Sequence, residues 1–530
     1  MILAIIMSVW SIIPLRTGKK RTGGIIKITF SLVFILLSAC TQTPDNTLRV
    51  GLASAPVTLD PRIATDATSS RINRLIYARL VEFNEKQLPV PGLAKWEVIS
   101  PVHYRFYLNE KAANKEKLKK DVNKNTRIFH DGTYLTASDV QATYNSILNP
   151  ELASPHRATL SMIDVIDVVD ENTIDFHLSR PDILFPAYLV IGILPEKLIK
   201  STHSFSRQPV GSGPFEFSSW PENGKLFLKR LKDNQAVNFI RVKEDTVRVL
   251  KLIRGEIDMV QNDLSPELVS HLSKQKEIKV THARGSNFTY LGFNLEDEMV
   301  GQQNVRRAIA LAIDRDAIIK YVMAGAAKSA SALLLPDHWA GNPDLVKLDY
   351  NPEKAIALLN EAGYTKTNPL RLTYKTSTNA FRVRLATVLQ SQLKEVGIEV
   401  DLRSYDWGTF YGDIKAGNFQ MFSLSWVGIK TPDIFRYVFH SDAVPPNGAN
   451  RGRFKDEVSD SLIKTAGTAT TLDKQAISYR QLQKRLLEKL PYVPLWYENH
   501  VFAAREGITG YHLGLDGNYD GLTQVVKESL

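Results

Sequence analysis

Few residues in this chain of 530 could form a nucleophilic or metal centre. The single cysteine, Cys40, cannot close an intrachain disulfide or hold a zinc ion alone. Two Ser-x-x-Lys patterns, Ser273–Lys276 and Ser461–Lys464, lack Ser-Asp-Asn and Lys-Thr-Gly companions, and there is no Gly-x-Ser-x-Gly, His-Glu-x-x-His or Walker motif. The eleven His residues form no close pairs at helical spacing. We therefore expect no enzyme activity, no metal site and no cofactor.

The stretch before Cys40 has the features of an export signal. It holds five basic residues and no acidic ones, and neither of its uncharged runs, Met1–Leu15 and Ile28–Ala39, reaches the ~20 apolar residues of a membrane-spanning helix. Leu37-Ser38-Ala39-Cys40 resembles a bacterial lipobox, which implies diacylglyceryl transfer to the Cys40 thiol and cleavage before it. The alternative is a plain signal peptide with a chance cysteine.

This interpretation assigns residues 1–39 to a lipoprotein signal peptide and residues 40–45 to a polar tether. The protein would then be exported and held to a bacterial membrane by the lipid on Cys40. It would face the periplasm or the cell exterior.

Composition excludes several other classes of protein. The chain is 44% hydrophobic and 23% charged, which fits about three ordinary folded units. Its net charge of +10 includes the five basic residues before Cys40, and without them 61 basic residues face 56 acidic ones, a charge of +5. We therefore expect no nucleic-acid partner.

Strand-like and helix-like segments mix along the chain after Leu48, which predicts an α/β architecture. The expected strands are Leu48–Leu52, Tyr104–Leu108, Thr173–Leu178 and Ile398–Leu402; the expected helices are Val305–Ile319, Pro352–Ala362 and Arg382–Val396. Asn351 is expected to cap a helix, as is Thr136 or Ser138, while Gly363 and Gly397 end helices. The Lys-rich segment Lys111–Lys124 is expected to be a solvated insertion.

A series of short motifs runs over nearly the whole chain after the lipobox. They are Leu59–Pro61, Pro91–Ala94 with Trp96, Phe129–Thr133, Leu135–Val140, Val210–Phe215, Leu291–Asn294, Val305–Ile309, Ala312–Arg315, Gly397–Ile398, Trp426 and Pro491–Trp496. In this order and spacing they resemble the family 5 extracellular solute-binding proteins, the dipeptide and oligopeptide receptors of ABC importers. Most of these residues are expected to stabilise the fold rather than contact a ligand. Arg306 and Arg307 are expected to form surface ion pairs.

The resemblance implies a periplasmic-binding-protein-like fold (type II, large cluster) in which two lobes close on a ligand. Residues 46–82, 206–284 and 497–530 would form lobe I, with residues 83–205 as its extra domain, and residues 285–496 would form lobe II. The segments 282–286 and 498–502 would be the hinges.

The same resemblance points to ligand-binding residues around Trp426-Val427-Gly428-Ile429. In the peptide receptors an acidic residue soon after the tryptophan binds the ligand's α-amine, but Ile429 stands at that position here. A buried ammonium needs a counter-charge, so Asp433, or an acid elsewhere, would have to substitute. Trp426 could stack on the ligand or fill the lobe interface, whereas Trp407 is expected to pack within its lobe.

The ligand's carboxylate would be bound by an arginine at the start of an upstream helix. Two arginines stand there, Arg384 in the better-matching position and Arg382 second. An arginine can bind a carboxylate through two parallel hydrogen bonds. The alternative for either residue is an exposed charge on the helix surface.

These inferences predict a monomeric, lipid-anchored receptor that captures a peptide or peptide-like solute. It would deliver the solute to the permease and ATPase subunits of an ABC importer. The alternatives are a receptor for a non-peptide solute on the same fold, including a metal complex or haem, and an exported hydrolase or sensor. For the last, Lys430 or a Ser-x-x-Lys pair would be reactive.

Overall fold

A computed structural model describes residues 46–109, 127–221 and 224–528. The signal peptide, Cys40, the tether and the Lys-rich segment Lys111–Lys124 lie outside these residues. Residues 47–528 form one compact unit. No helix in the described part of the chain is both long and apolar enough to cross a membrane.

The largest element is an 11-stranded mixed sheet. Its order across the sheet is β15 (Ile398–Tyr405), β14 (Leu370–Ser377), β16 (Met421–Trp426), β12 (Ile278–Phe293), β17 (Tyr492–Arg505), β11 (Met259–Gln261), β1 (Leu48–Leu52), β10 (Ala236–Arg241), β9 (Lys225–Arg230) and β8 (Phe215–Ser219), with β13 (Ala327–Ser329) pairing with β17. β1 lies between two parallel neighbours, β10 and β11, and four of its five residues are buried. Burial on both faces explains its nearly continuous apolar sequence.

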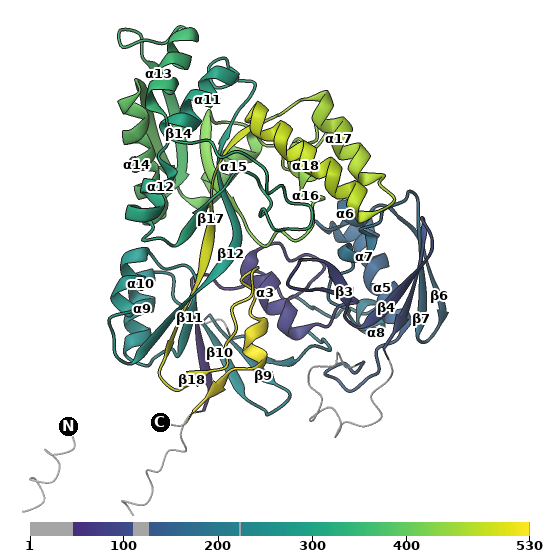
Figure 1. Ribbon diagram of the computed structural model, residues 1–530. Helices are drawn as coiled ribbons and strands as arrows, with labels where there is room; N and C mark the ends of the chain where they lie inside the picture. The colour runs from purple at the N-terminus through teal and green to yellow at the C-terminus, as the bar shows by residue number, and fades with distance from the viewer. Residues whose placement is uncertain (1–45, 110–126, 222–223, 529–530) are drawn as a thin grey trace, which may run out of the picture. The chain divides into compact units, whose positions relative to one another are not determined.

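Strands β12 and β17 are the two long members of the sheet, with 16 and 14 residues, and run side by side in opposite directions (Figure 1). One end of the pair meets β11, and the other end meets β16. Their register is interrupted between Ala283 and Asn287 of β12. Three residues there, 284–286, stand opposite one residue of β17, so the pair is irregular at the predicted hinge.

The α-helices between residues 303 and 489 have ends that follow local sequence rules. They are α11 (Gln303–Ala312), α12 (Arg315–Ala317), α13 (Pro352–Glu361), α14 (Ala380–Glu395), α15 (Trp407–Ala416), α16 (Ile434–Phe439), α17 (Glu457–Gly467) and α18 (Leu472–Lys489). Two of them, α14 and α15, contact β14 and β15. The predicted cap is confirmed at Asn351, whose Oδ1 accepts a 2.9 Å hydrogen bond from the Lys354 N–H. Gly363 and Gly397 follow helices with φ of 87° and 90°, a region that favours glycine.

A second sheet lies in the segment predicted as the extra domain. Its order is β4 (Ala94–Ser100), β5 (His103–Leu108), β7 (Thr173–Leu178) and β6 (Ile163–Asp170), all antiparallel. Helix α5 (Ala137–Leu148) contacts β6 and β7. Thr136 caps this helix in a capping box with Asp139, so of the two predicted caps Thr136 is the one used.

The remaining elements are short. They are α3 (Ala67–Ile76), β2 (Val81–Phe83), β3 (Pro89–Pro91), η2 (Pro150–Leu152), α6 (Arg157–Leu160), α7 (Phe185–Tyr188), α8 (Glu196–Ile199), α9 (Asp245–Ile253), α10 (Pro266–Leu272), η3 (Ile318–Val322), β18 (Ile508–Thr509), η4 (Asp520–Thr523) and β19 (Val526–Lys527). The loop before β8 approaches α3 closely, since a Cβ on Gly211 would lie 2.1 Å from the Ile76 carbonyl oxygen. Only glycine fits at that point.

The buried apolar side chains form separate clusters. One draws on residues 78–193, another on residues 48–77 together with later segments up to 525, and two more on residues 288–497. This grouping resembles the predicted division into an extra domain and two lobes, whose boundaries remain a prediction.

Three expectations from the sequence are wrong. The predicted helix Val305–Ile319 is not continuous, because α11 ends at Ala312, Ile313 is extended and α12 begins at Arg315. Arg306 is not a surface ion-pairing residue, because it is buried and donates hydrogen bonds to backbone carbonyls, including Leu490 O at 2.7 Å. Burial lowers the pKa of Arg306 to about 10. Trp407 does not pack inside its lobe: it is 59% exposed and stacks on Tyr411 with 5.4 Å between ring centroids.

Candidate functional site

An ion pair joins the start of α14 to the middle of β17. Asn379 caps α14 by accepting a hydrogen bond from the Arg382 N–H, which fixes the first turn that carries the Arg382 side chain. The Arg382 guanidinium donates to both carboxylate oxygens of Glu498, at 2.7 and 3.3 Å. Thr289 Oγ1 of β12 donates to the same carboxylate at 2.7 Å and also lies 2.6 Å from Ser425 Oγ of β16.

The environment favours the charged forms of both partners. Burial opposes ionisation of Glu498, yet the Arg382 guanidinium and the hydrogen bond from Thr289 hold the pKa of this carboxyl below its usual range. The Glu498 charge in turn raises the pKa of Arg382. The Arg382 and Glu498 side chains are 32% and 21% exposed, so solvent reaches both of them. A polar, accessible ion pair therefore lies where β12, β16 and β17 meet α14.

Arg384 lies elsewhere, although it is only two residues away. Its guanidinium pairs with Glu267 of α10 at 2.8 Å, and the two side chains are 42% and 59% exposed. The pair joins residues that the sequence assigns to different lobes. The two candidate arginines thus have different partners, and Arg382 is the one next to the Glu498 carboxylate.

Trp426, the last residue of β16, is half-buried beside a second arginine. The Arg451 guanidinium lies 4.8 Å from the Trp426 ring centroid, within cation–π range. Arg451 is 8% exposed and donates hydrogen bonds to the phenol oxygens of Tyr290 and Tyr411, at 3.0 and 3.2 Å. Burial lowers the pKa of Arg451, but these phenols outweigh burial and the net shift is upward.

A small pocket of about 30 Å³ lies beside Trp426 and Arg451, lined mainly by aromatic rings. That volume holds roughly one water molecule. A peptide could occupy this place only if the lining residues moved apart.

The segment after Trp426 turns sharply. Val427 is 45% exposed, and Gly428 has a φ of 69° with open space where a Cβ would lie. Ile429 is 8% exposed and packs in the apolar cluster that also holds Phe435 and Tyr479. The position at which the sequence lacks an acid is therefore occupied by a core side chain.

Asp433 stands next to the first residue of α16 with a partly buried side chain. The Thr431 hydroxyl donates a hydrogen bond to its carboxylate. Burial raises the pKa of Asp433 to about 6, and the nearby Asp182 carboxylate adds to the shift.

Asp182 is a second acidic residue whose pKa is shifted. Burial raises the pKa of Asp182, whose carboxylate accepts a 3.3 Å hydrogen bond from the Tyr188 hydroxyl. The Arg180 guanidinium lowers the pKa of Asp182 but does not outweigh burial. Asp433 and Asp182 are therefore two neighbouring carboxyl groups that both resist ionisation.

The Lys430 side chain, which follows Ile429 directly, is also held by an ion pair. Its ammonium forms a 2.5 Å ion pair with Asp516, and the two side chains are 15% and 18% exposed. Burial lowers the pKa of Lys430, while Lys430 and Arg74 hold the pKa of Asp516 well below its usual range. The Lys430 side chain is thus a structural partner rather than a free nucleophile.

Sequence reasoning named Arg382, Arg384, Trp426 and Asp433 but not their partners. Glu498 was not predicted to bind the ligand. As the only acidic residue in the mostly apolar strand β17, it could have been recognised from the sequence. Arg451 and Asp182 gave no comparable signal, since their roles depend on residues far away in the chain. The structure brings Arg382 to Glu498 and pairs Arg384 with Glu267, while the Asp182 carboxylate is close enough to Asp433 to raise its pKa.

Comparison with known proteins gives a consistent set of relatives. The sequence model described as "Bacterial extracellular solute-binding proteins, family 5 Middle" matches residues 116–444. The dipeptide-binding protein of Escherichia coli (strain K12) is 26% identical over 530 aligned residues, which cover 94% of this chain and 97% of that protein. Heme-binding protein A of Haemophilus influenzae is 25% identical over 548 aligned residues, covering 91% and 96%.

Similarity also extends to a solved structure. The oligopeptide-binding protein AppA of Bacillus subtilis, in complex with a nonapeptide, superimposes with a TM-score of 0.77 at 24% identity. The match covers 91% of this chain and 99% of AppA. The two chains therefore share a fold along almost their whole length, which agrees with the periplasmic-binding-protein-like α/β fold expected from the sequence.

Proposed function

This chain belongs to family 5 of the bacterial extracellular solute-binding proteins, and from that membership we propose that it captures a peptide or peptide-like solute for an ABC importer. The Escherichia coli relative is named for dipeptide binding, and AppA was solved with a nonapeptide. The charged groups around β16, β17 and α14 are of the kinds that bind the two ends of a peptide.

Two lobes closing around the ligand are part of the proposal. Lobe I comprises residues 46–82, 206–284 and 497–530, with 83–205 as its extra domain, and lobe II comprises residues 285–496. The separate apolar clusters and the irregular register of β12 and β17 support this division. A few residues at the irregularity would absorb the backbone rotation.

The observation that best supports a peptide ligand is the environment of the Asp433 carboxylate. It is partly buried, its pKa is raised to about 6, and it is close to the second acid, Asp182. An ammonium ion bound between them would remove the electrostatic cost of ionising both carboxyls. We therefore assign Asp433, with Asp182, to the ligand's α-amine, in place of the acid that Ile429 replaces.

Arg382 is the better candidate for the ligand's carboxylate. Its guanidinium is partly exposed and already donates hydrogen bonds to both carboxylate oxygens of Glu498. A ligand carboxylate could share or replace Glu498 with the same donors. Trp426, Val427 and Gly428 would contact the ligand between its ends.

The rest of the proposal concerns the surroundings of the receptor. The protein would be a monomer, exported and anchored through lipid on Cys40, and its partners would be the permease and ATPase subunits. It would catalyse no reaction. In support, Ser273 and Ser461 are exposed, and the Ser273 hydroxyl donates to the Ser270 carbonyl oxygen rather than contacting a lysine.

Native mass spectrometry of protein purified from cells without refolding tests the proposal. A series of adducts matching short peptides, lost in Asp433→Asn, is the expected result. One discrete non-peptide adduct would favour the second candidate, a receptor for another solute. That candidate is supported by the aromatic pocket at Arg451 and by the haem-binding relative. Adducts unchanged by Asp433→Asn would remove Asp433 from the site.

A further inference from the structure

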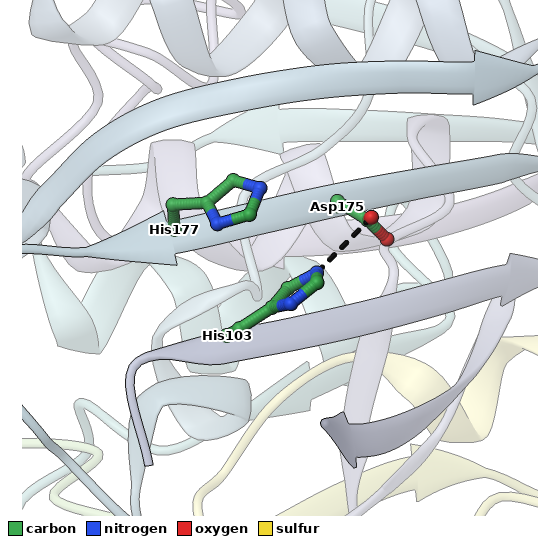
Figure 2. Close-up of side chains that lie close together, drawn as sticks. All are labelled: His103, Asp175 and His177. Atoms are coloured by element: carbon green, nitrogen blue, oxygen red, sulfur yellow. Dashed lines mark ion pairs between the residues drawn. The ribbon is translucent and has the colours of Figure 1, made fainter. Parts of the chain in front are cut away.

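A cluster of side chains that bind metals elsewhere in proteins lies on the four-stranded sheet, within the predicted extra domain. His103 of β5 stands directly opposite His177 of β7 in the antiparallel register, and Asp175 stands opposite Arg105. Directly opposed side chains on one face of a sheet are close enough to interact. Figure 2 shows both imidazoles and the Asp175 carboxylate gathered over neighbouring strands.

The side chains are close together. The two imidazole rings stack with 4.3 Å between centroids. His103 Nε2 lies 3.0 Å from Asp175 Oδ2, and one nitrogen or oxygen atom from each of His103, Asp175 and His177 lies within 4.8 Å of the others. Asp167 of β6 lies next to the group, with its Oδ2 atom 3.3 Å from His177 Nε2.

The apolar packing of the domain does not explain this arrangement. Tyr104 and Phe106, which alternate with His103 and Arg105 along β5, point to the buried side and belong to the apolar cluster. The His103 and His177 side chains, in contrast, are 21% and 38% exposed. The His103 Nε2 atom is shielded from solvent but makes no hydrogen bond of acceptable geometry, despite its short distance from Asp175. His103 Nε2 therefore faces the Asp175 carboxylate without its hydrogen-bonding capacity being satisfied.

The local charge suits a divalent cation. Asp175 and Asp167 carry two negative charges, and Arg105 carries one positive charge, so the group with neutral imidazoles is negative by one. Arg105 donates to both oxygens of Asp175 at 2.7 Å, which fixes the carboxylate while leaving lone pairs on each oxygen. Arg105 would thus hold a metal ligand in place from the outer shell.

We propose that His103, His177 and Asp175 form a binding site for a divalent transition-metal ion on the outer face of this sheet, with Asp167 as a further ligand. Two imidazoles with carboxylate oxygens suit Zn²⁺, Ni²⁺ or Cu²⁺, whereas Mg²⁺ and Ca²⁺ prefer all-oxygen sites. Ligand atoms on one such ion lie about 3.4 Å apart in tetrahedral geometry. The site therefore requires small rotations of two partly exposed imidazoles and no movement of the strands.

Sequence reasoning gave no indication of this site. A search for histidines at helical spacing cannot find a pair that faces across two strands and is separated by a long stretch of chain. The site is independent of the proposed solute-binding residues, none of which belongs to β5, β6 or β7.

Titration of tag-free, chelator-treated full-length protein with Zn²⁺, followed by competition with a chromophoric chelator, tests the proposal. One site is expected in the wild type, with affinity at least about tenfold lower in His103→Gln and in His177→Gln, the loss that even outer-shell partners can cause. His271→Gln is the matched control, because His271 is exposed on α10. It should bind Zn²⁺ as the wild type does.

Electron paramagnetic resonance with Cu²⁺ identifies the ligands directly. Two coordinated imidazole nitrogens are expected in the wild type and one in each single variant. His177 is the more exposed of the two histidines, so His177→Gln is the variant least expected to disturb folding, which its thermal unfolding would check. Zn²⁺ affinity and Cu²⁺ spectra that are the same in the wild type and in His177→Gln would overturn the proposal.

Discussion

At the scale of single residues, two arginines of one helix turn have different surroundings. Arg382 donates to Glu498 in a partly buried network, whereas Arg384 pairs with Glu267 where both side chains are largely exposed. Exposed ion pairs contribute ~0–1 kcal/mol to stability, while hydrogen bonds to charged groups with less solvent contribute ~1.5–3 kcal/mol. The two residues should therefore respond differently to the same substitution.

Arg382→Gln is expected to lower ligand affinity at least tenfold, or about 1.4 kcal/mol, since it removes the only guanidinium beside Glu498 in the described structure. It should also lower the free energy of unfolding by about 1–2 kcal/mol, because Glu498 keeps its charge without its partner. Arg384→Gln serves as the control and should change both quantities by less than about 1 kcal/mol. Calorimetric titration with the peptides found by mass spectrometry, and urea unfolding, provide the measurements. A larger effect of Arg384→Gln would reassign the carboxylate-binding role.

The pKa of Asp433 predicts a pH dependence with a definite sign. Its folded-state pKa of about 6 lies above the usual 3.8, with Asp182, Tyr188 and Tyr479 as the neighbouring titratable groups. The cost of burying its charge is therefore absent below about pH 4 and complete above about pH 6. Asp433→Asn should thus raise the stability of the unliganded protein at pH 8, by about 1–2 kcal/mol, and leave it unchanged at pH 4. Urea unfolding at the two pH values provides the measurement.

Ligand binding should follow the ionised form of Asp433. Affinity for an α-amine is expected to be highest above pH 6 and to fall as the pH decreases, because a protonated carboxyl no longer attracts an ammonium. Asp433→Asn should weaken binding at pH 8 and flatten this profile. If the variant kept the wild-type affinity at pH 8, the amine would have to be bound by another acid.

At the scale of secondary structure, the irregular register of β12 and β17 is the feature most relevant to movement. Gly285 lies within it, and a Cβ there would be 2.2 Å from the Glu498 carbonyl oxygen. Gly285→Ala should therefore force the two backbones apart and lower the free energy of unfolding by about 1–3 kcal/mol. Ligand affinity should fall as well, because Glu498 is displaced. Urea unfolding and calorimetric titration test both effects.

Gly412→Ala is a suitable control for Gly285→Ala. Gly412 lies in α15 with no atom within 4 Å of the added Cβ, and alanine favours a helix over glycine by ~1 kcal/mol. This variant should be as stable as the wild type or more so. If Gly285→Ala were as well tolerated as Gly412→Ala, the close backbone contact would not matter for folding or closure.

Most strands and helices were predictable from local sequence. Which side chains pair with one another was not. β1 has the predicted bounds, Leu48–Leu52, and helix α13 begins after the predicted cap Asn351 because capping depends on neighbouring residues. Glu498 and Arg382 are 116 positions apart, and their pairing depends on strand register and on where α14 packs. The burial of Arg306 depends on the same long-range packing, so its expected surface position was wrong.

At the scale of the whole molecule, four ion pairs join residues assigned to different lobes. They are Arg382–Glu498, Arg384–Glu267, Lys430–Asp516 and Arg284–Asp337. Lys430–Asp516 is the most buried of the four, while the Arg284 and Asp337 side chains are 45% and 63% exposed. Solvent screens exposed pairs, so Lys430–Asp516 should contribute most to a closed arrangement.

Lys430→Gln is therefore expected to shift the equilibrium between open and closed forms toward the open form. Asp516 would keep a buried charge with one cation fewer, a cost that opening relieves through solvation. Ligand should dissociate at least about tenfold faster, which corresponds to ~1.4 kcal/mol. Stopped-flow dissociation measures this rate, and small-angle X-ray scattering should give a larger radius of gyration at subsaturating ligand. Arg284→Gln, which breaks the exposed pair, should change the rate less than about threefold. Equal rates in the two variants would mean that the buried pair does not hold the lobes together, and ligand contacts alone would then have to set the lifetime of the complex.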